Sequence, residues 1–404
     1  MERFKIVIVG GGMVGGFCLK ELAKLGVAAG EICLLSEDRA APYQRPPLSK
    51  EFLTDQQPLE KLAVNKTGFY EDHGIVLRLG AAVTGLDPAA HTVQAGGAAV
   101  GYDKLVLATG SASRRLDLPG AGLDGIFTLR SLDDCVRLKE AAARARKLVV
   151  IGGGFIGTEV GARLAQGGLD TTLTYREHKL LDFFFPPEIS ALYEDRYTSH
   201  GVRLLPATTP AEFVGEGGQV SGVRLDSGEV LAADMVLLAV GAAPNVGLAE
   251  AAGLTVDRWL VVNESLQTSD PDIFAGGDMM AYPDRYSGTM RHLEHEEHAR
   301  RCGRHLAREL HGDLQPYDYL PMVWSDVYDI SWEFRGDWAG VERIVYRGDV
   351  TSGQFSAWWL KQGRVIGALT PYSEDTALAD AATALIKERR PVDAATLQDE
   401  SVTL

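Results

Sequence analysis

The stretch KLVVIGGGFIGTE, from Lys147 to Glu159, decides the fold. An apolar run leads directly into the glycine pattern GxGxxG, formed by Gly152, Gly154 and Gly157. The run suits a strand buried on both faces of a parallel sheet, and the glycines suit the turn from that strand into a helix. One such match is weak on its own, because tight strand-to-helix turns also arise from packing.

The chain contains the same arrangement a second time, nearer its start. The stretch KIVIVGGGMVGG carries Gly10, Gly12 and Gly15 at the same spacing. Each copy is followed by a later apolar strand, YDKLVLATGSA in the first and ADMVLLAVGAAPN in the second. The sequence therefore predicts an α/β protein with two doubly wound, Rossmann-like nucleotide-binding domains.

An acidic residue follows the second strand of each copy. Glu37 lies 22 residues after Gly15, and Glu177 lies 20 residues after Gly157. In this pattern the glycines make the turn, admit a pyrophosphate and let the helix pack on the strand, while the acid accepts from a ribose hydroxyl. The helix N-terminus adds amide donors and the positive end of its dipole. We therefore expect two dinucleotide sites.

The second copy leaves the choice between NADH and NADPH open. Arg176 lies beside Glu177 in TYREHK. An acid favours the free 2′-hydroxyl of NADH, and an arginine favours the 2′-phosphate of NADPH. Arg176 also reads as an ordinary solvated loop charge.

Composition limits the classes of function. A chain of 404 residues exceeds one compact core, so two or three domains are expected. The formal net charge of −15 argues against nucleic acid and anionic membranes as partners. No apolar run approaches the length of a spanning helix, and no signal peptide precedes the strand KIVIV, so a cytoplasmic location is predicted.

The four cysteines indicate neither a metal centre nor a dithiol. Cys18, Cys33, Cys135 and Cys302 form no CxxC or CxxxxC pair and no cluster with zinc spacing. They suit single thiols in a reducing compartment. No metal site is predicted.

Two further segments suggest binding functions. YQRPPLSK holds Arg45 and Lys50 on either side of two prolines, which stiffen the loop. TSDPDIFAGGDMM places Asp278 at the carboxyl edge of a strand, where it could accept from a polyol or cap a helix.

At this point the chain resembles the FAD-dependent pyridine nucleotide oxidoreductases, in the branch of ferredoxin and rubredoxin reductases and apoptosis-inducing factor. The resemblance covers essentially the whole chain, and its most specific segments are PYQRPPLSK, GGGFIGTE, AGGD, LEHEEHARRCG, WSDVYD and WWLKQGRVIGA. It implies an FAD-binding domain at 1–113 and 244–317, an NAD(P)-binding domain at 114–243 and a C-terminal α+β domain at 318–404.

The resemblance also assigns roles to the stiff loop. It implies that Arg45 contacts FAD and that Lys50 lies near the flavin with Glu159 as its partner. A fixed cation stabilises the negative charge of reduced flavin, and a buried lysine needs a carboxylate partner. The alternative is a surface Lys50 and a Glu159 that only complements a helix N-terminus.

Further cofactor-binding positions follow from the same resemblance. Phe155 would pack against nicotinamide, with a core position at the helix start as its alternative. Trp324 would lie near the flavin, and Gly241 would allow close approach of the second nucleotide. The remaining assigned positions are Met13, Val14, Val83, Thr109, Gly110, Arg130, Ile156, Glu294, His295 and Glu296.

The chain departs from the family pattern in three places. Glu296 stands where ferredoxin reductases of this branch usually have a tryptophan, so His295 or Glu296 would line the nicotinamide side. PMVWSDV replaces the usual PWFWSDQ. Ala40 and Ala41 occupy the corner where relatives with a thiol relay have a cysteine, so electrons would leave FAD directly.

The leading interpretation is an FAD-dependent NAD(P)H oxidoreductase that reduces a small iron–sulfur protein, either a [2Fe–2S] ferredoxin or a rubredoxin. Arg300, Arg301, Arg304 and Arg308 would form a basic helix face for an acidic partner, or a solvated flank paired with acids of the chain itself. The alternatives are an enzyme acting on a quinone, a radical or oxygen, and a slow redox sensor. The sequence allows a monomer or a homodimer.

Overall fold

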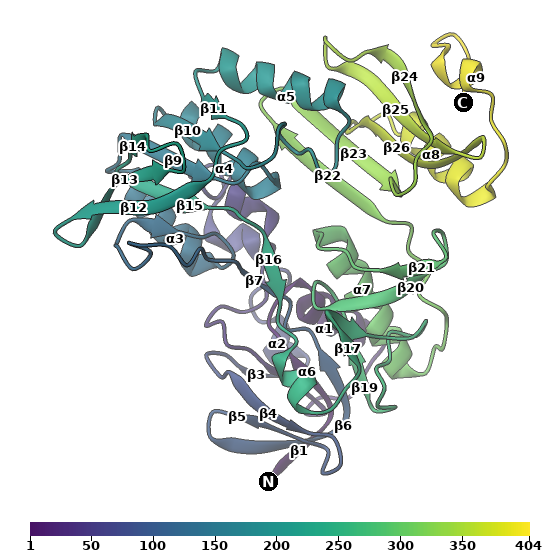
Figure 1. The fold of residues 1–404 in the computed structure, drawn as a ribbon. Coiled ribbons are helices and arrows are strands. Elements are labelled where there is room, and N and C mark those ends of the chain that lie inside the picture. The colour runs from purple at the N-terminus through teal and green to yellow at the C-terminus, as the bar shows by residue number, and fades with distance from the viewer. The chain divides into compact units, whose positions relative to one another are not determined.

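The computed structural model describes residues 1–404 and divides into two compact units (Figure 1). The first contains Met1–Pro46, Pro58–Ala112 and Ala243–Tyr319, and the second contains Pro47–Gln57, Ser113–Ala242 and Leu320–Leu404. The chain passes between them five times, and two of these crossings lie in strands, at β7 (Ser111–Ser113) and β16 (Ala242–Pro244). The finer division into domains at 113, 243 and 317 stays a prediction.

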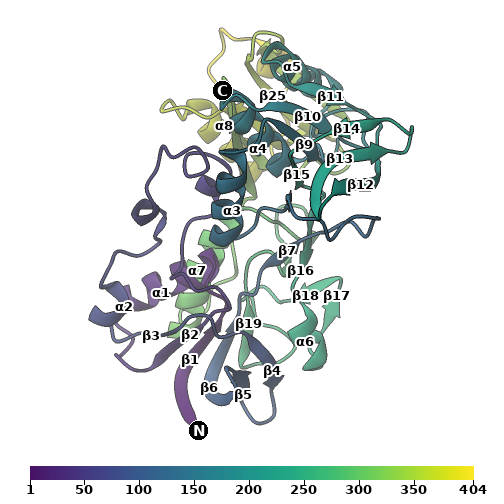
Figure 2. The same cartoon turned by 90° about the vertical axis from the view of Figure 1, so that its left-hand side faces the viewer.

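A seven-stranded sheet forms the centre of the first unit (Figure 2). Its parallel part has the order β3-β2-β1-β6-β19, and β5 and β4 continue from β6 as antiparallel strands. The strands are β1 (Glu2–Val9), β2 (Ile32–Leu35), β3 (Val76–Arg78), β4 (Val83–Asp87), β5 (Thr92–Ala95), β6 (Ala98–Leu107) and β19 (Ile273–Ala275).

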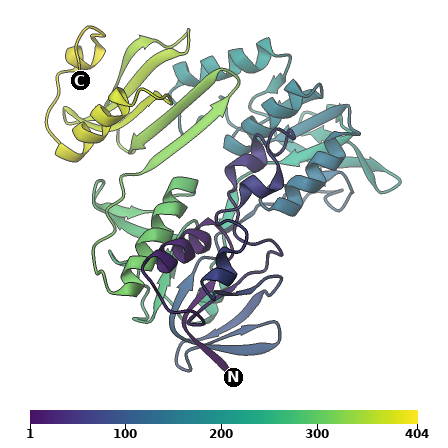
Figure 3. The same ribbon diagram turned by 180° about the vertical axis from the view of Figure 1, so that it is seen from behind.

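Two helices of the first unit pack side by side although the sequence separates them widely. They are α1 (Met13–Lys24) and α7 (Glu296–His311) (Figure 3). A Cβ atom on Gly303 would lie 2.5 Å from the carbonyl oxygen of Val14, so glycine permits this close approach. The other elements are η1 (Pro46–Ser49), which straddles the unit boundary, η2 (Leu59–Leu62), α2 (Phe69–Asp72), α6 (Gly247–Ala251) and the sheet β17 (Val256–Asp257), β18 (Trp259–Val261), β20 (Met280–Asp284) and β21 (Thr289–Arg291).

The second unit repeats the parallel arrangement. Its five-stranded sheet has the order β11-β10-β9-β15-β8, and all four pairings are parallel. The four strands around each glycine turn follow one order, β3-β2-β1-β6 in the first sheet and β11-β10-β9-β15 in the second, which confirms the predicted pair of doubly wound folds. The fifth strand differs, since β19 comes from later in the chain and β8 from earlier. The elements are β8 (Ile126–Phe127), α3 (Leu132–Ala142), β9 (Lys147–Ile151), α4 (Phe155–Gln166), β10 (Asp170–Thr174), α5 (Pro187–Ser199), β11 (Arg203–Leu205) and β15 (Met235–Leu238).

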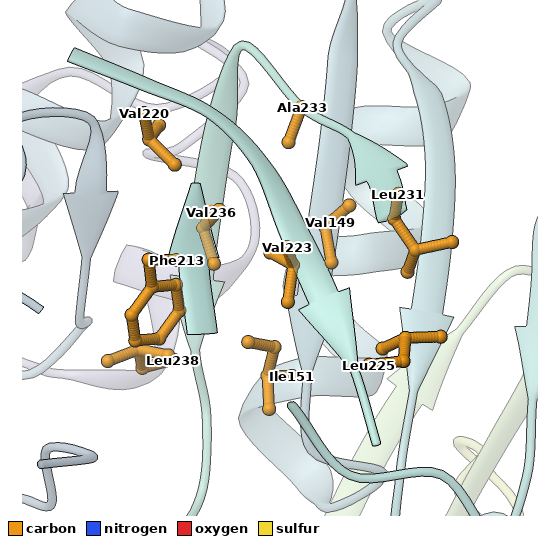
Figure 4. Close-up of a cluster of buried hydrophobic side chains, with 10 residues drawn as sticks. All are labelled: Val149, Ile151, Phe213, Val220, Val223, Leu225, Leu231, Ala233, Val236 and Leu238. Carbon is orange, nitrogen blue, oxygen red and sulfur yellow. The ribbon is translucent and has the colours of Figure 1, made fainter. Parts of the chain in front are cut away.

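An antiparallel sheet packs against this parallel sheet, and the two enclose a hydrophobic core. It consists of β12 (Pro210–Glu216), β13 (Gln219–Leu225) and β14 (Val230–Ala232). Figure 4 shows Val149, Ile151 and Val236 from the parallel sheet facing Phe213, Val223 and Leu231 from the antiparallel one. Burial of these apolar side chains fixes the carboxyl end of β9, from which the second glycine turn begins.

The C-terminal part of the second unit is an antiparallel sheet covered by helices, which confirms the predicted α+β fold there. Its order is β22-β23-β26-β25-β24, and α8 packs against β23 and β26. The elements are β22 (Met322–Val327), β23 (Ile330–Gly336), β24 (Arg343–Asp349), β25 (Gln354–Lys361), β26 (Arg364–Pro371), α8 (Ala377–Glu388) and α9 (Ala394–Gln398). No helix of the chain is both long enough and apolar enough to cross a membrane.

Candidate functional site

The first glycine turn is shaped by its own backbone. Gly10 has φ +124°, and a Cβ atom there would lie 2.1 Å from the carbonyl oxygen of Ala108. A Cβ on Gly15 would lie 2.3 Å from the carbonyl oxygen of Gly10. Gly12 differs, because a Cβ there would meet only the tip of Arg45, at 3.9 Å. The protein fold therefore requires the outer two glycines, while the middle one leaves open space.

The second glycine turn repeats this geometry. A Cβ on Gly152 (φ +120°) would lie 2.3 Å from the carbonyl oxygen of Ala239, and one on Gly157 would lie 2.1 Å from that of Gly152. A Cβ on Gly154 would meet only the ring edge of Phe183, at 4.0 Å. A middle glycine that packing does not require suits a turn that receives a bound pyrophosphate.

Both helices that follow the turns keep their first amides available. The N-cap residues of α1 and α4 are Gly12 and Gly154, and neither cap has a side-chain hydrogen bond. Met13 and Val14 are buried at the start of α1, while Ile156 is 40% exposed at the start of α4. Uncapped amides and an open backbone fit the two dinucleotides that the sequence predicts.

Residues predicted to contact FAD lie at several places in the first unit. Arg45 lies beside the first glycine turn, and its guanidinium carbon is 5.6 Å from the centre of the Tyr43 ring. Glu37 is exposed just beyond the carboxyl end of β2. Val83 opens β4, where it pairs with Ala95.

A reciprocal pair of hydrogen bonds holds the predicted ATG turn. Thr109 Oγ1 donates to the carbonyl oxygen of Asn245, and Asn245 Nδ2 donates to that of Thr109, both at 2.8 Å. Gly110 follows with φ +65°. Asp278 accepts from Ser111 Oγ at 3.1 Å and lies at the carboxyl end of β19. The next element is strand β20, so Asp278 does not cap a helix.

The segment at the start of α7 has a visible structural role. His295 is the N-cap of α7, and its Nδ1 accepts from the backbone amide of Glu297 at 3.3 Å. Glu294 is exposed and lies 3.0 Å from His292 Nε2, and the His292 ring stacks on Trp259 with centres 4.6 Å apart. Glu296 is the first residue of the helix.

The second unit brings Lys50 and Glu159 together. Lys50 is only 3% exposed, and its Nζ lies 2.7 Å from Glu159 Oε1. Glu159 lies in the second turn of α4 and is 7% exposed. Its Oε1 also accepts from Ser325 Oγ at 2.7 Å, and its Oε2 accepts from Ser49 Oγ at 2.6 Å. The surface alternative for Lys50 is therefore wrong, because a buried ammonium is paired with a buried carboxylate.

A second carboxylate, which the sequence analysis did not select, also binds Lys50. Asp326 Oδ1 lies 2.8 Å from Lys50 Nζ, and Asp326 Oδ2 accepts from Arg163 Nη2 at 2.9 Å. The ring centre of Trp324 lies 5.3 Å from Lys50 Nζ. Asp326 belongs to the WSD segment quoted above, and the available signal was an acid two residues after the selected tryptophan.

Phe155 lies in an aromatic cluster of the second unit. Its ring centre is 5.6 Å from Phe183, 5.5 Å from Phe184 and 6.1 Å from Trp332. Phe184 is buried, whereas Phe183 is 58% exposed at the rim of the second glycine turn. Packing in a cluster and contact with a nucleotide are both compatible with this position.

The other predicted nucleotide residues occupy the ends of strands and helices. Arg176 Nε donates to Glu177 Oε1 at 2.7 Å, just beyond β10. Gly241 has φ +96° with open space where a Cβ would be. The backbone amide of Arg130 donates at 3.1 Å to Asp134, which belongs to the capping box of α3.

The expected basic face on α7 is largely neutralised. Arg300 and Arg301 both donate to Glu297, at 2.5 and 2.7 Å, and Arg308 Nη2 donates to Glu21 at 2.9 Å. These pairings favour the alternative of a flank paired with acids of the chain itself.

The thiols are unsuited to a redox relay. All four cysteines are buried and unpaired. Burial raises the pKa of Cys33 to about 11 and the pKa values of Cys135 and Cys302 to about 12, and it also raises that of Cys18. Thiolate is the reactive form, so these side chains are inert at neutral pH.

Comparison with known proteins matches most of the chain to two family profiles. Residues 4–303 match the profile described as pyridine nucleotide-disulphide oxidoreductase, and residues 322–404 match the profile described as reductase C-terminal. The chain belongs to the pyridine nucleotide-disulphide oxidoreductase family. It is an FAD-dependent oxidoreductase of that family, and membership implies FAD and a nicotinamide nucleotide without specifying NADH or NADPH.

Individual members of the family resemble this oxidoreductase along most of its length. Monodehydroascorbate reductase of Pisum sativum is 35% identical over 412 residues, covering 95% of each chain. Rhodocoxin reductase of Rhodococcus erythropolis is 36% identical, covering 90% of this chain and 85% of its own. The crystal structure of the covalent putidaredoxin reductase–putidaredoxin complex matches with a TM-score of 0.93 and 32% identity, covering 99% of this chain and 97% of the other.

Proposed function

We propose that this oxidoreductase passes electrons from NADH or NADPH through FAD to a small iron–sulfur protein, a [2Fe–2S] ferredoxin or a rubredoxin. The observation that carries the proposal is the likeness along 99% of the chain to a reductase solved in complex with putidaredoxin, at a TM-score of 0.93. The inert cysteines support direct transfer from flavin to acceptor without a thiol relay.

The chain offers residues for both cofactors. In the first unit, FAD would be held by the first glycine turn, Glu37, Arg45, Thr109 and Asp278, while α4 and the Arg176–Glu177 pair of the second unit would hold the nicotinamide nucleotide. When bound, FAD accepts a hydride and releases single electrons. The buried ammonium of Lys50 would stabilise negative charge that develops on the flavin, because its surroundings are fixed before reaction.

Two finer assignments belong to the same proposal. Glu177 favours NADH as the donor, because Arg176 is already engaged with it. The four unpaired cysteines support a cytoplasmic location.

A second candidate function is reduction of a small acceptor such as a quinone or the monodehydroascorbate radical. The identity of 35% to the pea monodehydroascorbate reductase, over 95% of both chains, favours it. On α7, Arg300, Arg301 and Arg308 are paired with acids of the chain itself, which weakens the expected basic face as a docking surface for an acidic protein.

Anaerobic stopped-flow spectroscopy separates the two candidates. The FAD-loaded protein is reduced with NADH or NADPH and then mixed with a [2Fe–2S] ferredoxin, with monodehydroascorbate or with a quinone. Fast reduction of ferredoxin supports the first function. Fast reoxidation by the small acceptors alone, with slow transfer to ferredoxin, supports the second, and a long-lived reduced complex with every acceptor contradicts both.

A further inference from the structure

Lys50 has an acceptor for each of its three ammonium protons within the second unit. Glu159 Oε1 lies at 2.7 Å and Asp326 Oδ1 at 2.8 Å, and the backbone carbonyl oxygen of Asp326 lies at 3.4 Å. A lysine ammonium has three donors and no acceptor, so the set is complete. Two of the three acceptors belong to Asp326, which makes this residue, as much as Glu159, the one that fixes where the charge lies.

The charges around Lys50 balance only when a fourth side chain is included. Lys50 with Glu159 and Asp326 gives one positive and two negative charges. Arg163 follows Glu159 by four residues on α4, so both project from one helix face, and its Nη2 donates to the second oxygen of Asp326 at 2.9 Å. Glu51 is farther from Arg163, at 3.9 Å.

We propose that Asp326 and Arg163 are positioning residues that set the effective positive charge of Lys50 toward the flavin. Asp326 reduces that charge by binding the ammonium directly. Arg163 weakens this compensation, because its guanidinium binds the second oxygen of the same carboxylate. The proposal deepens the proposed function and rests on its placement of the flavin near Lys50.

The two residues therefore have opposite effects on bound FAD. Replacement of Asp326 by asparagine removes a negative charge and leaves Lys50 less compensated, which favours reduced flavin. Replacement of Arg163 by glutamine removes the second cation that binds Asp326. The carboxylate of Asp326 then compensates the charge of Lys50 more fully, which disfavours reduced flavin. A residue that served only to hold the fold would not shift flavin chemistry in opposite directions.

The test compares FAD-loaded, full-length D326N, R163Q and K50M with the unmodified protein. The first measurement is the flavin midpoint potential, from anaerobic spectroelectrochemical titration. D326N is expected to shift the potential upward, and R163Q and K50M to shift it downward. D329N and R196Q serve as matched controls, because Arg196 of α5 and Asp329 of the β22–β23 turn form a similar pair, with Nε and Oδ1 3.1 Å apart. Neither control should move the potential.

A second measurement separates failure of this inference from failure of the proposed flavin site. The denaturation midpoint is recorded for K50M, D326N and the double variant. If Asp326 holds Lys50, D326N loses less stability in the K50M background than alone. Equal losses in both backgrounds overturn the inference. If the stability losses of K50M and D326N are coupled but K50M does not shift the flavin potential, the placement of flavin near Lys50 is overturned. If K50M shifts the potential but D326N and R163Q shift it in the same direction, only the inference about Asp326 and Arg163 is overturned.

Discussion

The guanidinium of Arg176 donates to the carboxylate of its neighbour Glu177, with Nε and Oε1 2.7 Å apart. The Arg176 side chain is 80% exposed and that of Glu177 is 34% exposed. The two groups that we propose to distinguish NADH from NADPH are thus bound to each other just beyond β10. On this proposal, coenzyme preference depends on which of the two side chains the nucleotide engages.

Loss of the acid is expected to change coenzyme preference. In E177Q the side chain no longer offers a charged acceptor to a ribose hydroxyl, and Arg176 becomes available to a 2′-phosphate. The ratio of kcat/KM for NADH to that for NADPH should fall about tenfold, the value of one hydrogen bond to a charged group. Steady-state kinetics with both coenzymes measures it, and R176Q, the control, should not lower the ratio.

The middle and first glycines of the second turn should respond differently to alanine. G152A forces a Cβ to within 2.3 Å of the carbonyl oxygen of Ala239 at φ +120°, so the unfolding temperature should fall markedly. G154A meets only the ring edge of Phe183 at 4.0 Å, so stability should be retained while nucleotide affinity drops at least tenfold. Calorimetric unfolding and NADH titration measure the two effects. Unimpaired NADH binding by G154A would argue against a pyrophosphate at this turn.

Removal of the buried ammonium should destabilise the protein. K50M leaves Glu159 and Asp326 without their shared cation, and breaking a buried ion pair costs about 3–5 kcal/mol. The double variant K50M/E159Q should recover part of this loss, because one of the uncompensated charges is gone. Urea denaturation provides both free energies of unfolding. A K50M variant as stable as the original would contradict the assigned burial.

A buried histidine predicts acid sensitivity of the first unit. His298 is fully buried under Tyr282 and Tyr317, and burial lowers its pKa to about 3, below the ordinary value of 6.5. Between these two values the unfolded chain binds a proton that the folded chain does not. Stability should therefore fall as the pH falls from 7 to 5, by roughly 2 kcal/mol from this group.

The variant H298Q isolates that contribution. Its free energy of unfolding is expected to change less between pH 7 and pH 5 than that of the original protein, even if it is lower at pH 7. The exposed histidine His73 provides the control, since H73Q should keep the original pH dependence. If the free energy of unfolding changes equally with pH in H298Q and H73Q, burial does not lower the pKa of His298.

The nucleotide folds were predictable from the sequence because their determinants are local. The contacts that require Gly15 and Gly157 are with the carbonyl oxygens of Gly10 and Gly152 in the same strand–turn–helix segment, so the glycine spacing encodes them. The pairing of Lys50 with Glu159 spans distant segments and was anticipated only through family resemblance. The structure brings these residues together, while their contact with flavin stays a prediction.

The partners of charged side chains were predictable only where they are local. The sequence left open that the arginines of α7 are paired with acids of the chain itself, and Glu297, three and four residues before Arg300 and Arg301, could have been named from helical spacing. The partner of Arg308 is Glu21 on α1, which only tertiary structure reveals. Asp326 likewise binds Lys50 because β22 packs against α4.

Because the two units are interleaved along the chain, the residues of one unit are not synthesised consecutively. The chain crosses between them at residues 46/47, 57/58, 112/113, 242/243 and 319/320. Lys50 and Glu159 leave the ribosome early, yet Asp326 and Ser325 arrive after four-fifths of the chain has been made. While the chain is being made, Lys50 and Glu159 therefore lack part of the surroundings that bury them in the folded protein. Assembly of this cluster is thus a late step of folding on the ribosome.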